Sequence, residues 1–223
     1  MTPATSGPST GWRRSRESSA SPNGGHIVAS PLISTSPPAL ALGAAFVIWV
    51  GGEVALQVRS RRAAAPSSGD RHSMPILIAS VWAAVALGLW LSLASTRYRL
   101  PLAPGPAELA GAAAMVAGVA LRGWAIATLG RQFTVRISTE PAHSLVTEGP
   151  YRWLRHPGYL GSLITVLGAL VAFDSWPGLA LLALPGAASA WRIAVEEAAL
   201  RRHFGSAYDL YSGARKRLIP GLF

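Results

Sequence analysis

Five apolar stretches, each close to the length of a membrane-spanning helix, constrain this chain more than any other feature. They cover residues 38–58, 75–95, 107–129, 157–173 and 179–204. A helix needs roughly 20 apolar residues to cross the hydrocarbon core of a bilayer. Within that core the backbone must satisfy its own hydrogen bonds, which a helix does internally. The sequence therefore predicts an all-α, polytopic membrane protein with about five transmembrane helices.

The last two apolar stretches are expected to form a helical hairpin. The fourth stretch is short, and the sequence DSWPG at 174–178 separates it from the fifth. Pro185 is expected to kink the fifth helix because proline lacks the N–H of an internal helix bond. After Phe204 the chain becomes polar and basic. This change predicts a cytoplasmic, helical segment at the C-terminus.

The charged residues support a membrane protein rather than a nucleic-acid-binding protein. Only 13% of the residues are charged, about half of the usual share in soluble proteins. The net charge is +10, but most arginines lie between the apolar stretches, where they set topology and contact anionic membrane lipids. The arginine-rich segments 59–74, 130–156 and 201–217 are expected to face the cytoplasm, with the N-terminus outside. Lys216 is the sole lysine among 20 basic residues, and this bias, together with abundant alanine, suggests a GC-rich bacterial genome. The expected location is therefore the bacterial cytoplasmic membrane.

Residues 1–37 differ in composition from the rest of the chain. They are rich in Ser, Pro, Gly and Thr, and such a segment buries too little apolar surface to offset its chain entropy. We expect a disordered tail at 1–37 and one membrane-embedded domain at 38–223. The chain has no cysteine and five histidines without helical ligand spacing. A metal site is therefore not expected.

Two polar motifs lie beside the last apolar stretches. The first is GPYRWLRHPGYLG at 149–161, and the second begins RIAVEEAALRRHFG at Arg192. Interfacial anchoring accounts for Arg152 and Trp153. It does not account for acidic side chains at the membrane edge, because charges in a membrane segment are costly and are functional candidates. Glu53 and Arg122 are also intramembrane charges, and we expect structural ion pairs there.

Together the two motifs resemble the isoprenylcysteine carboxyl methyltransferase family. The first follows the family pattern GxYxxxRHPxYxG, and the second follows EExxLxxxFGxxYxxY with a proline near the end. The matching positions are Gly149, Tyr151, Arg155, His156, Pro157, Tyr159, Gly161, Glu196, Glu197, Leu200, Phe204, Gly205, Tyr208, Tyr211 and Pro220. The resemblance covers roughly residues 121–223, whereas the first two stretches match only in being hydrophobic.

The resemblance implies a membrane methyltransferase that uses S-adenosyl-L-methionine. It also implies a cytoplasmic-side cavity between the RHP region and the C-terminal helix. No glycine-rich strand–turn–helix fingerprint is present, so the cofactor is not expected on a Rossmann domain. The expected cofactor-binding residues are Tyr151, Arg155, His156, Pro157, Tyr159, Glu197 and Tyr208.

Their chemistry suggests individual roles. Arg155 and His156, with backbone N–H groups at the next helix start, suit the cofactor carboxylate. Pro157 suits the first turn of that helix, and the tyrosines suit the adenine or ribose. Arg192 is the candidate for orienting the substrate carboxylate or the cofactor, with Glu196 holding Arg192. A purely structural Arg192–Glu196 ion pair remains the alternative.

The substrate is expected to be lipophilic or lipidated and to enter between helices from the membrane. Carboxylate, thiol and amine acceptors all remain open, with the carboxylate preferred. Two other classes also remain. One is an NADPH-dependent sterol or enone reductase, for which Arg201, Arg202 and Arg215 would contact the additional phosphate. The other is a non-catalytic membrane protein of the same fold. Gly161 and Gly168, seven residues apart, are expected to permit close helix packing.

Overall fold

The structure is a computed structural model that describes residues 35–61, 72–94, 99–100, 104–130 and 145–218. The regular elements are helical: α1 (Pro37–Arg61), α2 (Ser73–Ala94), α3 (Pro104–Leu129), the 3₁₀ helix η2 (Gly149–Arg152), α4 (Pro157–Ala172), α5 (Trp176–Ala180), α6 (Ala183–Phe204) and α7 (Ser206–Gly213). Within these ranges the expected all-α fold is confirmed. Most of the predicted tail, 1–34, lies outside the described residues, and so does Pro220 of the second motif.

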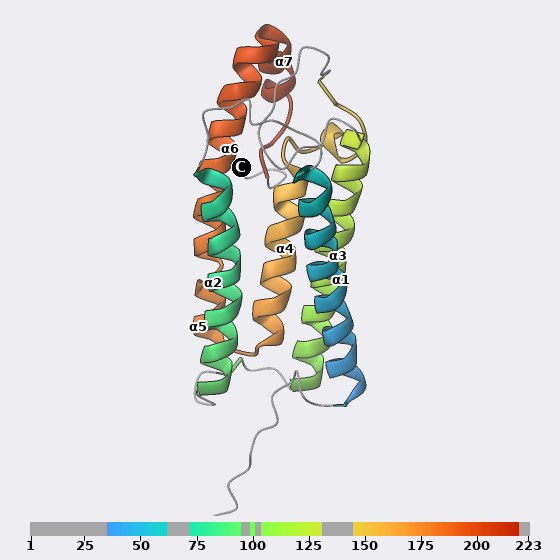
Figure 1. Cartoon of the computed structure of the whole chain (residues 1–223), viewed down its shortest axis with the longest axis vertical. Helices are drawn as coiled ribbons and strands as arrows, with labels where there is room; N and C mark the ends of the chain where they lie inside the picture. The colour runs from blue at the N-terminus through green and yellow to red at the C-terminus, as the bar shows by residue number, and fades with distance from the viewer. Residues whose placement is uncertain (1–34, 62–71, 95–98, 101–103, 131–144, 219–223) are drawn as a thin grey trace, which may run out of the picture.

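In the part of the chain that the structure describes, four helical segments are long and apolar enough to cross a membrane. They are Pro37–Val58, Ser73–Ala94, Gly105–Leu129 and Trp176–Phe204. The fourth predicted span is α4, an apolar helix of 16 residues, which is about 24 Å long at 1.5 Å per residue. In Figure 1, α4 lies between the pair α2 and α6 on one side and the pair α1 and α3 on the other. The polytopic helical membrane architecture is therefore confirmed.

The fifth predicted span is interrupted at Leu181 and Leu182, between α5 and α6. A proline cannot donate to the carbonyl four residues earlier, which for Pro185 is that of Leu181, so the interruption lies on the side where Pro185 is expected to disturb the helix. Pro185 lies in the first turn of α6. A proline there loses no internal hydrogen bond, so it is compatible with the start of a helix.

Glycines hold α3 and α4 close together. A Cβ atom built on Gly168 would lie 2.6 Å from the carbonyl oxygen of Gly111, and one built on Gly161 would lie 2.6 Å from that of Gly118. These distances leave no room for a methyl group, so the backbones are in direct contact. The predicted packing role of Gly161 and Gly168 is confirmed, and their partners are two glycines on α3 that are also seven residues apart.

Away from the polar motifs, apolar side chains of α1, α2, α3 and α4 pack together between the helices. Leu42, Ala84, Leu170 and Phe173 are almost fully buried there and belong to one hydrophobic cluster. Phe46 of α1 stacks on Phe173, with ring centroids 5.9 Å apart. The upper part of the bundle in Figure 1 is different, because the polar motifs meet there. Helix α7 lies at that end, beyond the C-terminal end of α6.

Candidate active site

The C-terminal segment pairs with the first motif through the backbone. The amide of Arg155 donates to the carbonyl of Lys216 (2.9 Å), and the amide of His156 donates to the carbonyl of Arg217 (3.1 Å). Leu154 and Lys216 form a parallel bridge. The hydroxyl of Tyr211 adds a bond to the backbone oxygen of Tyr151 (3.0 Å). These contacts bring the two motifs together at the upper end of the bundle.

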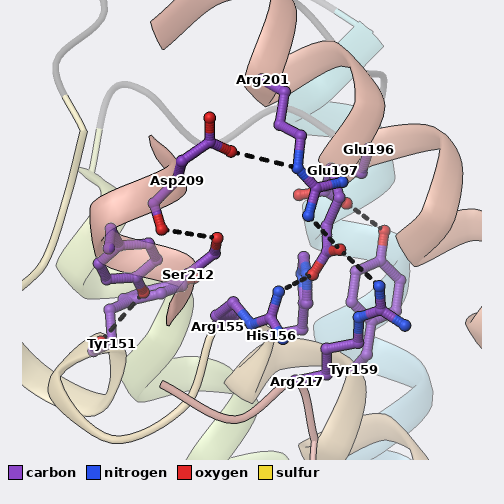
Figure 2. A network of polar contacts seen from close by, with 11 residues as sticks. Tyr151, Arg155, His156, Tyr159, Glu196, Glu197, Arg201, Asp209, Ser212 and Arg217 are labelled. Carbon is purple, nitrogen blue, oxygen red and sulfur yellow. Dashed lines mark hydrogen bonds and ion pairs between the residues drawn. The ribbon is translucent and has the colours of Figure 1, made fainter. Parts of the chain in front are cut away.

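Glu197 of α6 is the centre of the charged contacts (Figure 2). Glu197 is fully buried. Its Oε1 accepts a hydrogen bond from Arg155 Nη1 at 2.7 Å and lies 3.3 Å from His156 Nε2. Its Oε2 faces Arg217 Nη2 at 3.0 Å and Arg201 Nη2 at 3.6 Å. One carboxylate therefore faces three guanidinium groups, and the cluster retains positive charge that suits an anionic ligand group.

A second polar group lies beside it and joins α4, α6 and α2. The hydroxyl of Tyr159 donates to Glu196 Oε2 at 2.8 Å and accepts from Arg192 Nε at 3.3 Å. Arg192 Nη1 donates to the hydroxyl of Ser73 at 2.8 Å. Arg192 and Ser73 are both buried. The guanidinium is thus held at a defined position between the helices.

A cavity of about 260 Å³ connects these groups. Of the predicted site residues, Tyr151, Arg155, His156, Tyr159, Arg192, Glu196 and Tyr208 line it. Apolar residues of α1, α2, α3, α4 and α6 make up most of the remaining lining, which also includes the charged Glu53 and Arg122, so the cavity has a polar end and a largely apolar end. Ligand sites commonly combine a largely apolar wall with a few placed polar groups.

Two predicted cofactor residues do not line the cavity. Glu197 lies behind Arg155 and His156 and positions both. Pro157 is buried at the first position of α4, where it sets the start of the helix. Glu196 was expected to hold Arg192, and both side chains contact the hydroxyl of Tyr159. The ligand-binding and catalytic roles of all these residues stay predictions.

Other residues of the site were not predicted from the sequence. Ser73 contacts Arg192, and Arg217 contacts Glu197. Glu53 and Arg122 line the cavity and pair with one another, with Arg122 Nε 2.6 Å from Glu53 Oε1. Each of the two was expected in a structural ion pair, but no local sequence pattern could predict that the residue on α1 pairs with the one on α3. The sequence also gave no indication of a role for Ser73, because a single serine at the start of a helix is common.

The tyrosines outside the membrane-spanning segments remain protonated. Burial raises the pKa of Tyr211 to about 12 and raises the pKa of Tyr208 and Tyr151 well above the usual value. All three side chains line the cavity. They therefore act as neutral phenols at physiological pH, able to stack on a ring or donate a hydrogen bond.

Two arginines considered for a phosphate contact are engaged within the chain. Arg201 faces Glu197 and also Asp209, with Nε 3.5 Å from Oδ1. The guanidinium of Arg215 lies 4.7 Å from the ring centroid of Tyr211.

Among the described residues, no three His, Asp or Glu side chains are grouped as metal ligands.

Comparison with known proteins gives concordant results. The profile described as "Isoprenylcysteine carboxyl methyltransferase (ICMT) family" matches residues 111–202. Protein-S-isoprenylcysteine O-methyltransferase A of Arabidopsis thaliana is 35% identical over 143 residues, which cover 60% of this chain and 73% of the relative. A probable protein-S-isoprenylcysteine O-methyltransferase of Oryza sativa subsp. indica is 37% identical over 105 residues, or 46% of this chain. This chain spans 55% of that rice relative.

Similarity extends to a bacterial protein and to a solved structure. The uncharacterized protein YpbQ of Bacillus subtilis is 30% identical over 95 residues, covering 42% of this chain and 56% of the relative. The structure of the eukaryotic intramembrane Ras methyltransferase ICMT matches with a TM-score of 0.56 and 21% identity. The aligned region covers 86% of this chain and 72% of the chain in the solved structure. At this identity the structural match supports the fold alone.

Proposed function

Because this chain belongs to the isoprenylcysteine carboxyl methyltransferase family, we propose that it is an S-adenosyl-L-methionine-dependent methyltransferase of the membrane. The proposed acceptor is the carboxylate of a lipophilic or isoprenoid-bearing substrate. The observation that carries the proposal is the 2.7 Å contact between Arg155 of the RHP motif and Glu197 of the EE motif, beside a cavity with one polar and one apolar end.

The polar end offers groups that fit each part of the methyl donor. Arg155 and His156 line the cavity and suit its carboxylate, and both are oriented by Glu197. The carboxylate of Glu196 suits its ammonium group or ribose hydroxyls. Tyr151 and Tyr208 suit its ring system as neutral phenols. Side chains that are already oriented by buried partners lose little conformational entropy when they bind a ligand.

The chemistry requires alignment more than proton transfer. When bound by Arg155, His156 and Glu196, the donor would supply an electrophilic methyl group on a sulfonium for transfer to the acceptor carboxylate. A carboxylic acid with a pKa of about 4 is already ionised at neutral pH, so no general base is needed. The task of this chain is to orient the acceptor and exclude water.

Arg192 is the proposed residue for orienting the acceptor carboxylate. Its guanidinium lines the cavity and is fixed by Tyr159 and Ser73. A buried guanidinium binds a carboxylate through charge-assisted hydrogen bonds. The apolar end of the cavity would hold the lipophilic tail, which enters from the surrounding membrane. We place the chain in the bacterial cytoplasmic membrane, with its C-terminus in the cytoplasm.

The deciding experiment is direct binding of S-adenosylhomocysteine or NADPH to detergent-purified protein, measured by calorimetry. We expect S-adenosylhomocysteine to bind and NADPH to bind at least tenfold more weakly. Binding of NADPH alone would support the reductase class instead, and binding of neither would support a non-catalytic protein. Tritiated methyl donor then identifies the acceptor, because a carboxyl methyl ester releases its label in mild base whereas a methylamine does not.

A further inference from the structure

We infer that Trp49 and Trp82 close the apolar end of the cavity and limit the tail length of the substrate. The inference rests on the proposed function for the identity of the polar head, but its physical basis is separate. It assigns a specificity-determining role to residues of α1 and α2, the part of the chain whose sequence carries no family motif.

The position of the two indoles follows from the residues that line the cavity. On α1, α2, α4 and α6 the lining residues farthest from the polar end are Trp49, Trp82, Val166 and Pro185. On α3 that residue is Arg122, whose Nη1 donates to the carbonyl of Gly158 at 3.4 Å. The rings of Trp49 and Trp82 stack at 5.6 Å between centroids, with 20° between their planes. The stack therefore spans from α1 to α2 at the bottom of the cavity.

Beyond Trp49 the described part of the bundle is packed with apolar side chains, whereas Trp82 is 43% exposed. Trp49 is 5% exposed and belongs to the hydrophobic cluster below the cavity. The ring of Phe46 lies 5.9 Å from that of Trp49 and also stacks on Phe173. Protein interiors packed in this way accept an additional methylene only by displacing side chains. A tail that reaches the indoles meets a wall of aromatic rings.

The distance from the polar end to this wall is short. Ser73, which binds Arg192, and Trp82 are nine positions apart on α2, or about 13 Å at 1.5 Å of rise per residue. Arg192 and Pro185 are seven positions apart on α6, or about 10 Å. The enclosed part of the cavity therefore holds about 10–13 Å of an apolar tail, so acids whose tails fit within this length are preferred over acids with longer tails.

The test uses two substitutions with opposite expected effects. Trp82→Ala removes the half-exposed indole, leaves the buried Trp49 in place and should admit longer tails. Ile78→Phe adds volume one turn nearer the polar end, where Ile78 lines the cavity, and should exclude tails that the parent accepts. The matched control is Trp90→Ala, because Trp90 is on the same helix, is 62% exposed and does not line the cavity.

The measurement is competition of straight-chain fatty acids of increasing length against a labelled short-chain acid, with protein in lipid nanodiscs. Trp82→Ala should raise the affinity ratio of long to short acids about tenfold, the value for roughly two additional buried methylenes. Ile78→Phe should lower it. The inference is overturned if Trp82→Ala matches the Trp90→Ala control, if both test variants shift the ratio in the same direction, or if no acid binds.

Binding of S-adenosylhomocysteine by the same preparations reports on the proposed function separately. If the tail-length ratios shift as expected but S-adenosylhomocysteine does not bind, the proposed function fails and the role of the two tryptophans is supported. If S-adenosylhomocysteine binds but the ratios are unchanged, the proposed function is supported and the inference about Trp49 and Trp82 is rejected.

Discussion

At the scale of single residues, the site depends on a buried carboxylate that does not itself face the ligand space. Glu197 is fully buried and contacts Arg155, His156 and Arg217. Removing one partner of a buried ion pair leaves uncompensated charge, which costs about 3–5 kcal/mol. Here the charges left behind would be those of the residues proposed to bind the methyl donor. Glu197 is therefore a positioning residue for Arg155 and His156.

Glu197→Gln should weaken S-adenosylhomocysteine binding at least tenfold, because the neutral amide no longer orients two cationic or hydrogen-bonding side chains. Calorimetry on detergent-purified protein measures the change. Glu148→Gln is the matched control, since Glu148 is exposed and immediately precedes η2 of the same motif. Equal affinities for parent and Glu197→Gln would contradict the proposed positioning role.

Arg192→Lys should lower kcat by about tenfold to a hundredfold while S-adenosylhomocysteine affinity stays within about twofold. A lysine ammonium cannot reproduce the planar fork that contacts both Tyr159 and Ser73 and still binds an acceptor carboxylate. Methyl transfer at saturating donor measures kcat. The control is Arg202→Lys on the exposed face of α6. Full turnover by Arg192→Lys would reject the orienting role and support a structural ion pair.

At the scale of elements, the contact between α3 and α4 sets the position of the RHP motif. The four glycines of this contact let the two backbones touch. Helix α4 begins at Pro157, directly after His156, so any shift of α4 along α3 also moves Arg155 and His156. Helix α6 carries the acidic partners from the other side. The site therefore requires α4 to keep its close approach to α3.

Gly168→Ala should destabilise the protein by about 1–3 kcal/mol, because its methyl group would lie 2.6 Å from the Gly111 carbonyl and 2.7 Å from the Met115 amide nitrogen. Unfolding in detergent, followed by circular dichroism, measures the loss. Gly123→Ala on α3 is the control, since nothing lies within 4 Å of that Cβ. It should be neutral or slightly stabilising, because alanine favours a helix. Equal stabilities of the two variants would contradict the packing role.

At the scale of the whole molecule, the start of α1 and the C-terminal helix α7 lie at opposite ends of the helical bundle. Figure 1 shows α1 beginning at the lower end, whereas α7 and the site lie at the upper end. Arg155, Arg201 and Arg217 are all at the site end. A concentration of basic residues at one membrane face is typical of the cytoplasmic side, which supports the proposed orientation and the proposed supply of a soluble methyl donor.

A reporter fused after Phe223 should therefore score as cytoplasmic in bacterial cells. A reporter fused after Ala94, at the end of α2, should score as extracytoplasmic, since α2 runs from the site end to the opposite end. Paired alkaline phosphatase and green fluorescent protein fusions measure both positions. An extracytoplasmic signal at Phe223 would invert the proposed orientation and the proposed source of the donor.

The sequence alone determined the helical membrane architecture and the motifs of the site, because both are recorded in local patterns. Apolar length specifies a span wherever it occurs, and each polar motif is contiguous. The tertiary structure alone decided the partners. Arg192 and Ser73 are 119 residues apart in the sequence, and Arg122 and Glu53 are 69 apart. Such contacts depend on which helices pack together and in which rotation, and helices that are apolar on every face leave that choice open. The stacking of Trp49 on Trp82 likewise depends on how α1 and α2 are placed relative to one another.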